Sequence, residues 1–220
     1  LGARLNDRVT GKIDGFAPKA KVMQIDLDPF QLGKSRAADL AINADIGEFL
    51  RAWLPLLGKR KRSGWISRVN ELKARYPFYD QENLDFFTPS NLLRSLGEIL
   101  PSDAIITTDV GQHQMWTAQF YPFLKPGHFL TSGGFGTMGF GLPVAIGAAL
   151  AAPQKEIICV SGDGSLLMNM QELITLKELN LNVKILLFDN GALGMVRQQQ
   201  ELFFGGRKTA SEFEAGPDFP

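Results

Sequence analysis

The chain has one cysteine, no surplus of either charge and no long apolar run, and each shortage excludes a class of protein. Cys159 is the single cysteine in 220 residues, so disulfides play no part in the fold and a reducing compartment such as the cytoplasm fits. The 23 basic residues balance the 23 acidic ones, and this balance gives no indication of a nucleic-acid partner. No apolar run is long enough to span a membrane, and no signal peptide is visible at the start. The 45% hydrophobic content then predicts a soluble globular protein whose partners are neither nucleic acid nor membrane.

The most informative stretch of the second half predicts a strand, a helix and a second strand. Residues 157–160 form a short, β-branched apolar run that stops at Gly-Asp-Gly (162–164). Apolar residues then recur at helical spacing over 166–180. A second apolar run over 183–188 ends at Asp-Asn-Gly (189–191), and another helical pattern follows. We expect a β-α-β unit with parallel strands.

Both strands of this unit end in a turn that bears an oxygen ligand, Asp163 after the first and Asn190 after the second. In a parallel sheet both turns lie at the carboxyl edge, where open α/β folds bind ligands. A carboxylate and a carboxamide can take two positions around Mg²⁺, which usually leaves its other positions to water and substrate phosphates. Gly164 and Ser165 begin the next predicted helix, so its free N–H groups and the positive end of its dipole favour a phosphate at the same point. The predicted occupant is a Mg²⁺-bridged diphosphate.

Gly-Asp-Gly followed by 25 intervening residues and an Asn at a strand end is the signature of thiamine-diphosphate enzymes, which this chain resembles here. Either tripeptide alone would indicate an ordinary turn, because Gly, Asp and Asn are the commonest turn residues. A rival interpretation is the Gly-x-Gly-x-x-Gly pattern at 134–139, which follows a predicted strand as a dinucleotide-binding loop would. Such a site needs an acid at the end of the next strand to bind the ribose, and Asp163 is at that position. Asp163 lies inside Gly-Asp-Gly at the start of a helix, however, where it is better placed to bind a metal than a ribose. The dinucleotide site is therefore the runner-up among enzymes.

The rest of the chain predicts two domains. Strands over 21–27 and 40–45 and an amphipathic helix over 46–57 are too few to bury a core alone, so residues 1–57 look like the end of a domain. Residues 58–85 are charged and suit a connector, whose basic run at 59–62 is more typical of a solvated helix face than of a binding patch. Residues 86–220 alternate strands and helices, which predicts an α/β domain with a parallel sheet covered on both faces.

Several segments resemble the family of acetohydroxyacid synthase (acetolactate synthase) large catalytic subunits. In the second domain they are TDVGQHQMW (108–116), TSGGFGTMGFGLPVAIGA (131–148), GDGSLLMNMQEL (162–173) and GMVRQQQ (194–200). Two more, RLNDRVTGK (4–12) and QIDLDPFQLGK (24–34), are similar to the end of the family's Rossmann-like, FAD-binding central domain. The resemblance implies that 1–57 is the C-terminal part of that central domain and that 86–220 is the thiamine diphosphate-binding domain, C-terminally incomplete.

The resemblance also implies an activity, cofactors and partners. The family decarboxylates pyruvate and adds the resulting enamine to a second 2-ketoacid, in branched-chain amino acid biosynthesis, and thiamine diphosphate carries this chemistry. Mg²⁺ is the metal, FAD is a structural cofactor, and the substrates are small 2-ketoacids. We expect a cytoplasmic enzyme that forms a homodimer or higher homo-oligomer with its site at the subunit interface, and that pairs with a small regulatory subunit. The alternatives are a sister enzyme of the pyruvate oxidase or glyoxylate carboligase type and a non-catalytic cofactor-binding fragment.

The resemblance assigns candidate roles to residues of three groups. The metal ligands are Asp163, Asn190 and the carbonyl of Ala192. Met138, Gln112, His113 and Gln199 are the candidate catalytic residues, with Met138 bending the cofactor and the next two contacting its diphosphate. The other thiamine diphosphate contacts are Val110, Gly111, Gly136, Gly162, Gly164, Ser165, Leu193, Gly194 and Met195. The FAD candidates are Gly2, Arg4, Arg8, Val9, Asp26, Leu27, Asp45 and Ile46.

Two departures from the family pattern affect these expectations. Many members have Trp where this chain has Gln199, and that Trp shapes the preference for the larger second substrate. The family glutamate that activates thiamine lies in a domain that these 220 residues do not contain. We therefore expect the chain alone to be inactive.

Overall fold

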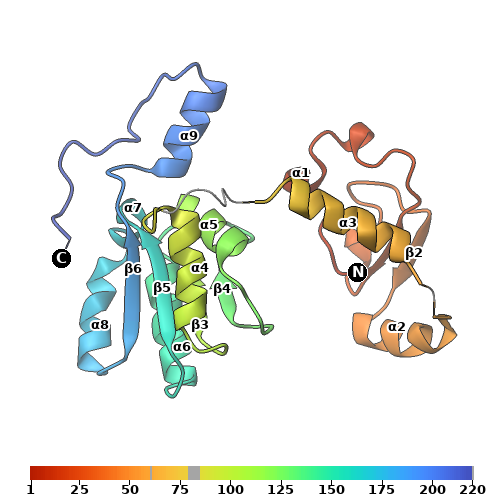
Figure 1. Cartoon of the computed structure of the whole chain (residues 1–220), viewed down its shortest axis with the longest axis horizontal. Helices are drawn as coiled ribbons and strands as arrows, with labels where there is room; N and C mark the ends of the chain where they lie inside the picture. Colours follow the sequence, from red (N-terminus) through yellow and green to blue (C-terminus); the bar gives the residue numbers. More distant parts are fainter. Residues whose placement is uncertain (60, 79–84, 220) are drawn as a thin grey trace. The chain divides into compact units, whose positions relative to one another are not determined.

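A computed structural model describes residues 1–59, 61–78 and 85–219 of the chain (Figure 1). The contacts divide the chain into two compact units, Leu1–Glu71 and Leu72–Pro220.

The first unit is built around two short parallel strands, β1 (Met23–Asp26) and β2 (Leu40–Asn43), with Ile25 opposite Ile42. Ile25 is 1% exposed and is the buried centre of this pair. Asp45 caps α2 (Ile46–Trp53) by accepting from Glu48 N–H at 3.0 Å, as the residue type favours. The unit's other elements are α1 (Asp7–Thr10), η1 (Ile13–Gly15), η2 (Pro29–Gln31), η3 (Leu54–Leu56) and α3 (Ser63–Arg75), the last of which runs into the second unit.

The second unit contains a four-stranded parallel sheet in the order β4-β3-β5-β6. Its strands are β3 (Ile105–Thr108), β4 (Phe129–Thr131), β5 (Ile157–Gly162) and β6 (Val183–Phe188). Register places Cys159 of β5 between Thr107 of β3 and Ile185 of β6. Every residue of β3 and β5 is buried, and both strands begin with apolar residues, Ile105 and Ile106 in β3 and residues 157–160 in β5. The polar residues that follow, Thr107, Thr108 and Ser161, are buried as well.

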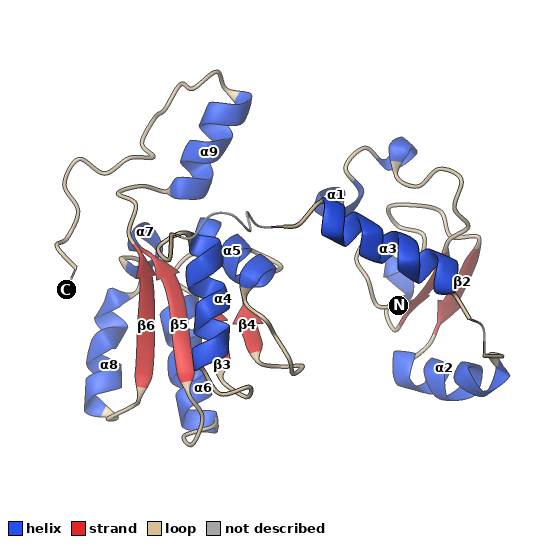
Figure 2. Cartoon of the chain, in the orientation of Figure 1, coloured by secondary structure: helices blue, strands red, loops and turns tan. Residues whose placement is uncertain are grey.

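Helices cover both faces of this sheet, as Figure 2 shows. The helices of the unit are α4 (Pro89–Ile99), α5 (Gln112–Phe120), α6 (Gly141–Ala151), α7 (Asp163–Leu166), α8 (Leu173–Glu178) and α9 (Gly194–Phe203), with the short η4 (Met170–Glu172) before α8. Of these, α9 lies beyond the ends of the strands and covers neither face (Figure 2). Leu142, Ala145 and Ala149 of α6 pack against Ile157 and Cys159 in one core cluster. The other face has a second cluster, in which Leu96 of α4 and Tyr121 pack on Ile106, Ile158 and Val160. The small residues of α6 allow the helix to lie close to the sheet.

The predicted parallel α/β arrangement is confirmed, and so is the buried position of Cys159, whose pKa burial raises to about 12. The strands predicted at 157–160 and 183–188 are present within two residues of their expected ends, as β5 and β6. The predicted connector at 58–85 includes residues 60 and 79–84, which lie outside the described residues. Among the residues the structure describes, no helix is both long and apolar enough to cross a membrane.

The predicted continuous helix over 166–180 is wrong. The chain instead forms the single turn α7, then η4, then the six-residue α8. The break lies at Asn169, which has φ −140° and donates from Nδ2 to the carbonyl of Gly139 at 2.7 Å. Side chains of Asn compete with the helix ladder for backbone partners, and here that partner is a distant loop.

Candidate functional site

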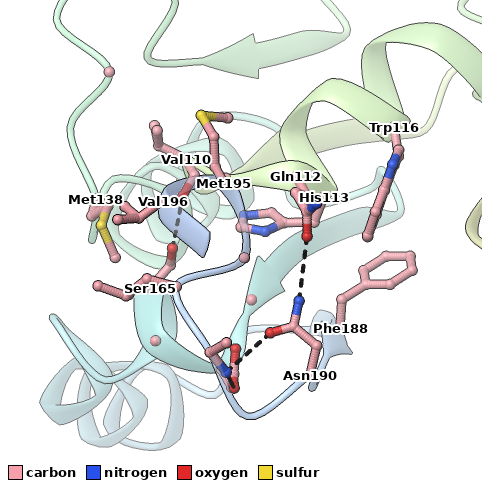
Figure 3. A pocket seen from close by; sticks show the side chains of 18 residues that line it. Val110, Gln112, His113, Trp116, Met138, Ser165, Phe188, Asn190, Met195 and Val196 are labelled. Atoms are coloured by element: carbon pink, nitrogen blue, oxygen red, sulfur yellow. Dashed lines mark hydrogen bonds between the residues drawn. The ribbon is translucent and has the colours of Figure 1, made fainter. Parts of the chain in front are cut away.

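The carboxyl ends of the strands surround a cavity of about 170 Å³ (Figure 3). Every thiamine diphosphate or metal candidate of the second unit lines it, and Gln199 is the one catalytic candidate that does not. The lining residues are Val110, Gly111, Gln112, His113, Trp116, Gly136, Met138, Gly162, Asp163, Gly164, Ser165, Phe188, Asn190, Ala192, Leu193, Gly194, Met195 and Val196. Sites for ligands of drug size are usually about 300–1,000 Å³. The cavity is therefore large enough for one end of a cofactor and too small to enclose a whole one.

Two of the three candidate metal ligands, the side-chain oxygens of Asp163 and Asn190, converge on one point of the cavity. The N–H of Ala192 donates both to Asp163 Oδ2 at 3.2 Å and to Asn190 Oδ1 at 3.1 Å. Register explains the convergence, because Gly162 of β5 lies opposite Phe188 of β6 and both strands end together. The expectation that the two oxygens share one edge of the sheet is therefore confirmed. Their chemistry, a carboxylate beside an amide oxygen, fits a small hard cation such as Mg²⁺.

The surroundings of Asp163 disfavour its charged form and raise the pKa of its carboxyl. It is 4% exposed, and burial, with a further contribution from the nearby Asp189 carboxylate, raises its pKa. Hydrogen bonds from the backbone of Gly164 and Ala192 act in the opposite direction. A divalent cation would relieve this repulsion, because it neutralises the charge that burial penalises. The described residues contain no cluster of three or more His, Cys, Asp or Glu, so any metal here would depend on amide, carbonyl and ligand oxygens as well.

Glycines keep the floor of the cavity free of side chains. A Cβ on Gly162 would lie 2.9 Å from His113 Nδ1, and one on Gly164 would lie 2.7 Å from a methyl carbon of Leu193. Gly111, with φ +158°, directly precedes the first residue of α5. A Cβ on Gly111 would also clash with the His113 ring. There is no room for a side chain at these three points, so packing against His113 and Leu193 requires glycine there.

The phosphate prediction at the start of α7 needs one correction. Asp163 is the first residue of α7, and Ser165 Oγ donates to the carbonyl of Val110 at 2.9 Å. Because α7 has four residues, its dipole is much smaller than that of the long helix predicted from the sequence. The prediction of a phosphate at this turn would therefore depend on local N–H groups and not on a helix dipole.

His113 is a buried neutral imidazole at the start of α5. Its side chain is 5% exposed, and Nε2 has no hydrogen-bond partner among the described residues. Burial lowers its pKa to about 4, against a smaller opposing effect of a hydrogen bond with the backbone of Asp109. A buried polar atom without a partner is uncommon in a folded protein and marks a place where a ligand group fits.

We expect the acid sensitivity of the fold to depend on His113. Its pKa is lower in the folded state than its ordinary value of 6.5, so the unfolded chain binds a proton first as pH falls. The stability contribution is complete above pH 6.5 and is lost as pH falls towards about 4, at a cost of up to about 3 kcal/mol. Urea unfolding of wild type and His113→Gln at pH 7 and pH 4.5 measures this, and the variant should lose less stability between the two. Equal losses in the two proteins would contradict the assignment.

The glycine-rich loop at 132–141 is held against the end of β3 by Asp109. This carboxylate is 1% exposed and accepts from the N–H groups of Gly139 at 2.8 Å and Gly141 at 3.2 Å. Gly136 and Gly139 have φ of +66° and +86°, conformations that favour glycine. The anchored loop carries Met138 to the wall of the cavity. Asp109 was not among the predicted site residues, and its role is to position Met138.

Sequence reasoning missed an aromatic wall. Trp116 and Phe188 line the cavity with ring centroids 5.6 Å apart. A signal for Trp116 was present, since it lies four residues after Gln112 and therefore on the same face of α5. Val196 on α9 was also missed. Gln199 is exposed, whereas its neighbour Gln198 accepts a hydrogen bond from Gln112 at 3.1 Å.

The FAD candidates of the first unit are only partly brought together. Gly2 has φ +55° and donates its N–H to the carbonyl of Ile25, and a Cβ there would lie 2.7 Å from Ile46. Asp26 ends β1 and Asp45 follows β2, so both acids lie at the carboxyl edge of the small sheet, beside Leu27. Arg4 and Val9 are exposed, and the side chain of Arg8 lies outside the described residues. The described atoms of these residues include no buried polar group without a partner, and no convergent set among them points to FAD.

Comparison with known protein families agrees with the geometry of the cavity. The family described as thiamine pyrophosphate enzyme, C-terminal TPP binding domain, matches residues 109–220. The family described as thiamine pyrophosphate enzyme, central domain, matches residues 1–53.

Individual relatives give the same result. The chain is 48% identical to acetolactate synthase isozyme 1 large subunit of Escherichia coli, over 93% of this chain and 36% of that protein. It is 45% identical to the isozyme 2 large subunit of the same organism, over 100% of this chain and 39% of that protein. A probable acetolactate synthase large subunit of Methanocaldococcus jannaschii is 44% identical over 100% of this chain and 39% of its own length. The chain thus spans somewhat more than a third of the length of these relatives.

Proposed function

The chain belongs to the thiamine pyrophosphate enzymes, and from that membership we propose that it is part of an acetolactate synthase large subunit. The subunit would decarboxylate pyruvate and join the two-carbon product to a second 2-ketoacid, in branched-chain amino acid biosynthesis. The observation that carries the proposal is the convergence of Asp163 and Asn190 on one N–H inside the cavity. The identity of 44–48% to acetolactate synthase large subunits supports this activity over a pyruvate oxidase, a glyoxylate carboligase or a non-catalytic fragment.

The proposed organisation places the catalytic residues in 86–220, with 1–57 as part of a central domain and 58–85 as a connector. The family matches at 1–53 and 109–220 support the two outer parts. The structure also divides into two units, Leu1–Glu71 and Leu72–Pro220, but the boundary between them lies inside α3. We propose that α3 belongs to the connector.

The second unit would hold the diphosphate end of the cofactor. Asp163, Asn190 and the Ala192 carbonyl would hold Mg²⁺, and backbone groups around Gly164 and Ser165 would face the diphosphate. Bound thiamine diphosphate supplies the carbon nucleophile that decarboxylation and carboligation require. The chain's own residues bind and orient it: Met138 and Val196 line one part of the cavity, while Trp116 and Phe188 form an apolar wall that limits water. The neutral His113 ring adds no positive charge and offers Nε2 to a ligand group.

FAD, the oligomeric state and the partner subunit complete the proposal. FAD would have a structural role at the edge of the first unit formed by Gly2, Asp26 and Asp45, and no reaction step depends on it. A site of this small volume in one unit is consistent with completion by another domain or by a second copy across a homodimer interface. The relatives are named as large subunits, and we propose a small regulatory partner and a cytoplasmic location.

The test of the proposed function is acetolactate formation by the complete subunit that contains these residues. The complete subunit, supplied with pyruvate, thiamine diphosphate and Mg²⁺, should release CO₂ and form acetolactate. A chimaera that carries these 220 residues in place of the matching segment of the Escherichia coli isozyme 2 large subunit should also be active. Parallel assays supply phosphate and oxygen together with pyruvate, or glyoxylate in place of pyruvate. Formation of acetyl phosphate in the first or of tartronate semialdehyde in the second, without acetolactate from pyruvate, would assign the chain to a sister enzyme.

We expect Gln199 to affect the choice of second substrate. It is exposed on α9, so such a role requires that this face of α9 meets the substrate in the complete subunit. Gln199→Trp should raise the preference for 2-ketobutyrate over pyruvate, because one buried methylene is worth about 1–3 kcal/mol of discrimination. Product ratios in competition assays measure the change. If they do not move, Gln199 lies outside the substrate site, as it lies outside the cavity in this unit.

A further inference from the structure

A chain of three amide side chains runs from α9 to the candidate metal position. Gln112 Nε2 donates to Gln198 Oε1 at 3.1 Å, and Asn190 Nδ2 donates to Gln112 Oε1 at 3.5 Å. Asn190 Oδ1 in turn accepts from Ala192 N–H, beside Asp163 Oδ2. The contact between Asn190 and Gln112 is drawn in Figure 3. Gln112 is far from both Asn190 and Gln198 in the sequence, so the two contacts join α5 to α9 and to the end of β6.

We propose that Gln198 is a positioning residue for the metal ligand Asn190 and acts through Gln112. Because Asn190 is a ligand only under the proposed function, the role of Gln198 rests on that proposal. An amide side chain can present either its oxygen or its NH₂ to a neighbour, and the neighbour decides which. Gln198 Oε1 requires the NH₂ of Gln112, so Gln112 turns its oxygen towards Asn190. Asn190 then turns its NH₂ to Gln112 and its oxygen towards Asp163, where a cation would be held.

The packing around Gly194 supports this reading. A Cβ on Gly194 would lie 2.7 Å from Asn190 Nδ2 and would overlap Gln112 Oε1. Gly194, the first residue of α9, therefore packs directly against the two amide groups of Asn190 and Gln112. Gln198 lies four residues later on the same face of the helix. Helix α9 thus contacts Gln112 at two points. No role for Gln198 follows from the cavity itself, since its side chain is exposed and outside the lining.

The polarity of the three amides can be tested with variants that keep, remove or reverse the acceptor at position 198. Gln198→Glu keeps an acceptor, Gln198→Leu has none, and Gln198→Lys offers only donors. The Lys variant should turn the oxygen of Gln112 to itself and so turn the NH₂ of Asn190 towards the cation. Gln119→Leu, an exposed glutamine at the other end of α5, is the matched control for the loss of an amide.

The readout is the Mg²⁺ dependence of thiamine diphosphate binding by the complete subunit, followed by calorimetry and by quenching of tryptophan fluorescence. Exposed hydrogen bonds are weak, so we expect apparent Mg²⁺ affinity to fall about threefold to tenfold in Gln198→Leu. The Glu variant should stay within about twofold of wild type and the Lys variant should be weaker than Leu. Measurement at low and high salt separates amide polarity from the added charges, because long-range charge effects are screened by salt.

A double variant tests the route through Gln112. In a Gln112→Leu background, Gln198→Leu should cause no further loss of Mg²⁺ affinity, because the intermediate amide is already gone. Additive losses would overturn the proposed route. Equal affinities in wild type and Gln198→Leu, or equal losses in the Glu, Leu and Lys variants, would overturn the positioning role itself, the latter in favour of simple helix docking. Wild-type binding without any Mg²⁺ dependence would instead remove the metal site and the proposed function with it.

Discussion

Asp163→Ala in the complete subunit is expected to abolish Mg²⁺-dependent binding of thiamine diphosphate. Asp163 is the only carboxylate among the described residues that line the cavity, so its loss leaves the cation with neutral protein ligands. Loss of a second-shell partner alone usually reduces metal affinity about 10–100-fold, so loss of the charged ligand should cost at least about a hundredfold. Calorimetric titration of the cofactor with Mg²⁺ and with a chelator measures the effect.

The fold should survive this substitution, which separates binding from folding. Ala192 N–H keeps Asn190 Oδ1 as its acceptor when Asp163 is removed. The substitution also removes a buried carboxylate whose pKa is raised, by burial first and by Asp189 as well. We therefore expect the thermal midpoint of the metal-free variant to equal or exceed that of wild type. Cofactor affinity that is unchanged by the substitution would be decisive against the metal assignment.

Asp189→Asn provides the matched control, because it removes a carboxylate next to the site that is not a proposed ligand. Asp189 Oδ1 accepts from Gly191 N–H at 3.2 Å, and an Asn oxygen can keep that turn. Mg²⁺-dependent binding should persist in this variant. A carboxylate binds metal in its ionised form, so Mg²⁺ affinity should fall as pH falls through the raised pKa of Asp163. Without the Asp189 charge this fall should occur at lower pH.

The sheet and the metal position could be predicted from the sequence because both depend on local patterns. Buried parallel strands read as short apolar runs, and the runs that became β5 and β6 are followed by Gly-Asp-Gly and Asp-Asn-Gly. Parallel register then brings Asp163 and Asn190 to the same edge without any further information. The glycines around the cavity could be predicted for the same reason, since they lie in the turns that follow the strands.

Contacts between distant segments could not be predicted. Apolar spacing over 166–180 is helical, but the side chain of Asn169 bonds to Gly139 and ends the helical turn. The spacing of apolar residues cannot indicate a hydrogen bond to a carbonyl 30 residues away in the sequence. Likewise the sequence drew attention to Gln199 through the family pattern, whereas the hydrogen bond to the cavity is made by Gln198. Three consecutive glutamines on one helix differ only in the direction each faces, and packing decides that direction.

The residues of the first unit do not by themselves support a prediction of FAD binding. Two strands of four residues and one buried Ile define it, and its acids at the sheet edge are also ordinary turn and cap residues. Asp28 Oδ1 caps the short η2, and Asp45 caps α2. The FAD assignment of Gly2, Asp26 and Asp45 therefore rests on the family match at 1–53 and on resemblance.

The 220-residue chain alone is expected to form no acetolactate, even with thiamine diphosphate, Mg²⁺ and FAD supplied. The described lining of the cavity contains no glutamate, and its one carboxylate, Asp163, is the proposed metal ligand, so no second carboxylate is left there to activate thiamine. A positioned acid–base group typically contributes about 10²–10⁴-fold to the rate. The small cavity would also leave much of the cofactor in water, since sites for such ligands usually bury about 70–90% of the surface.

The decisive experiment compares cofactor binding and turnover of the purified chain with those of the chimaera that contains the same residues. The purified chain should retain weak, Mg²⁺-dependent binding of thiamine diphosphate, and Asp163→Ala should remove it. The chimaera with the Escherichia coli isozyme 2 large subunit should regain turnover, because the remaining segments of that subunit supply the facing side of the site. Exposed apolar side chains such as Phe135, at 99% exposure, and Phe203, at 74%, should become protected in the chimaera. Turnover by the chain alone at the rate of the chimaera would show that the second carboxylate is dispensable, and the catalytic residues would then have to lie within this cavity.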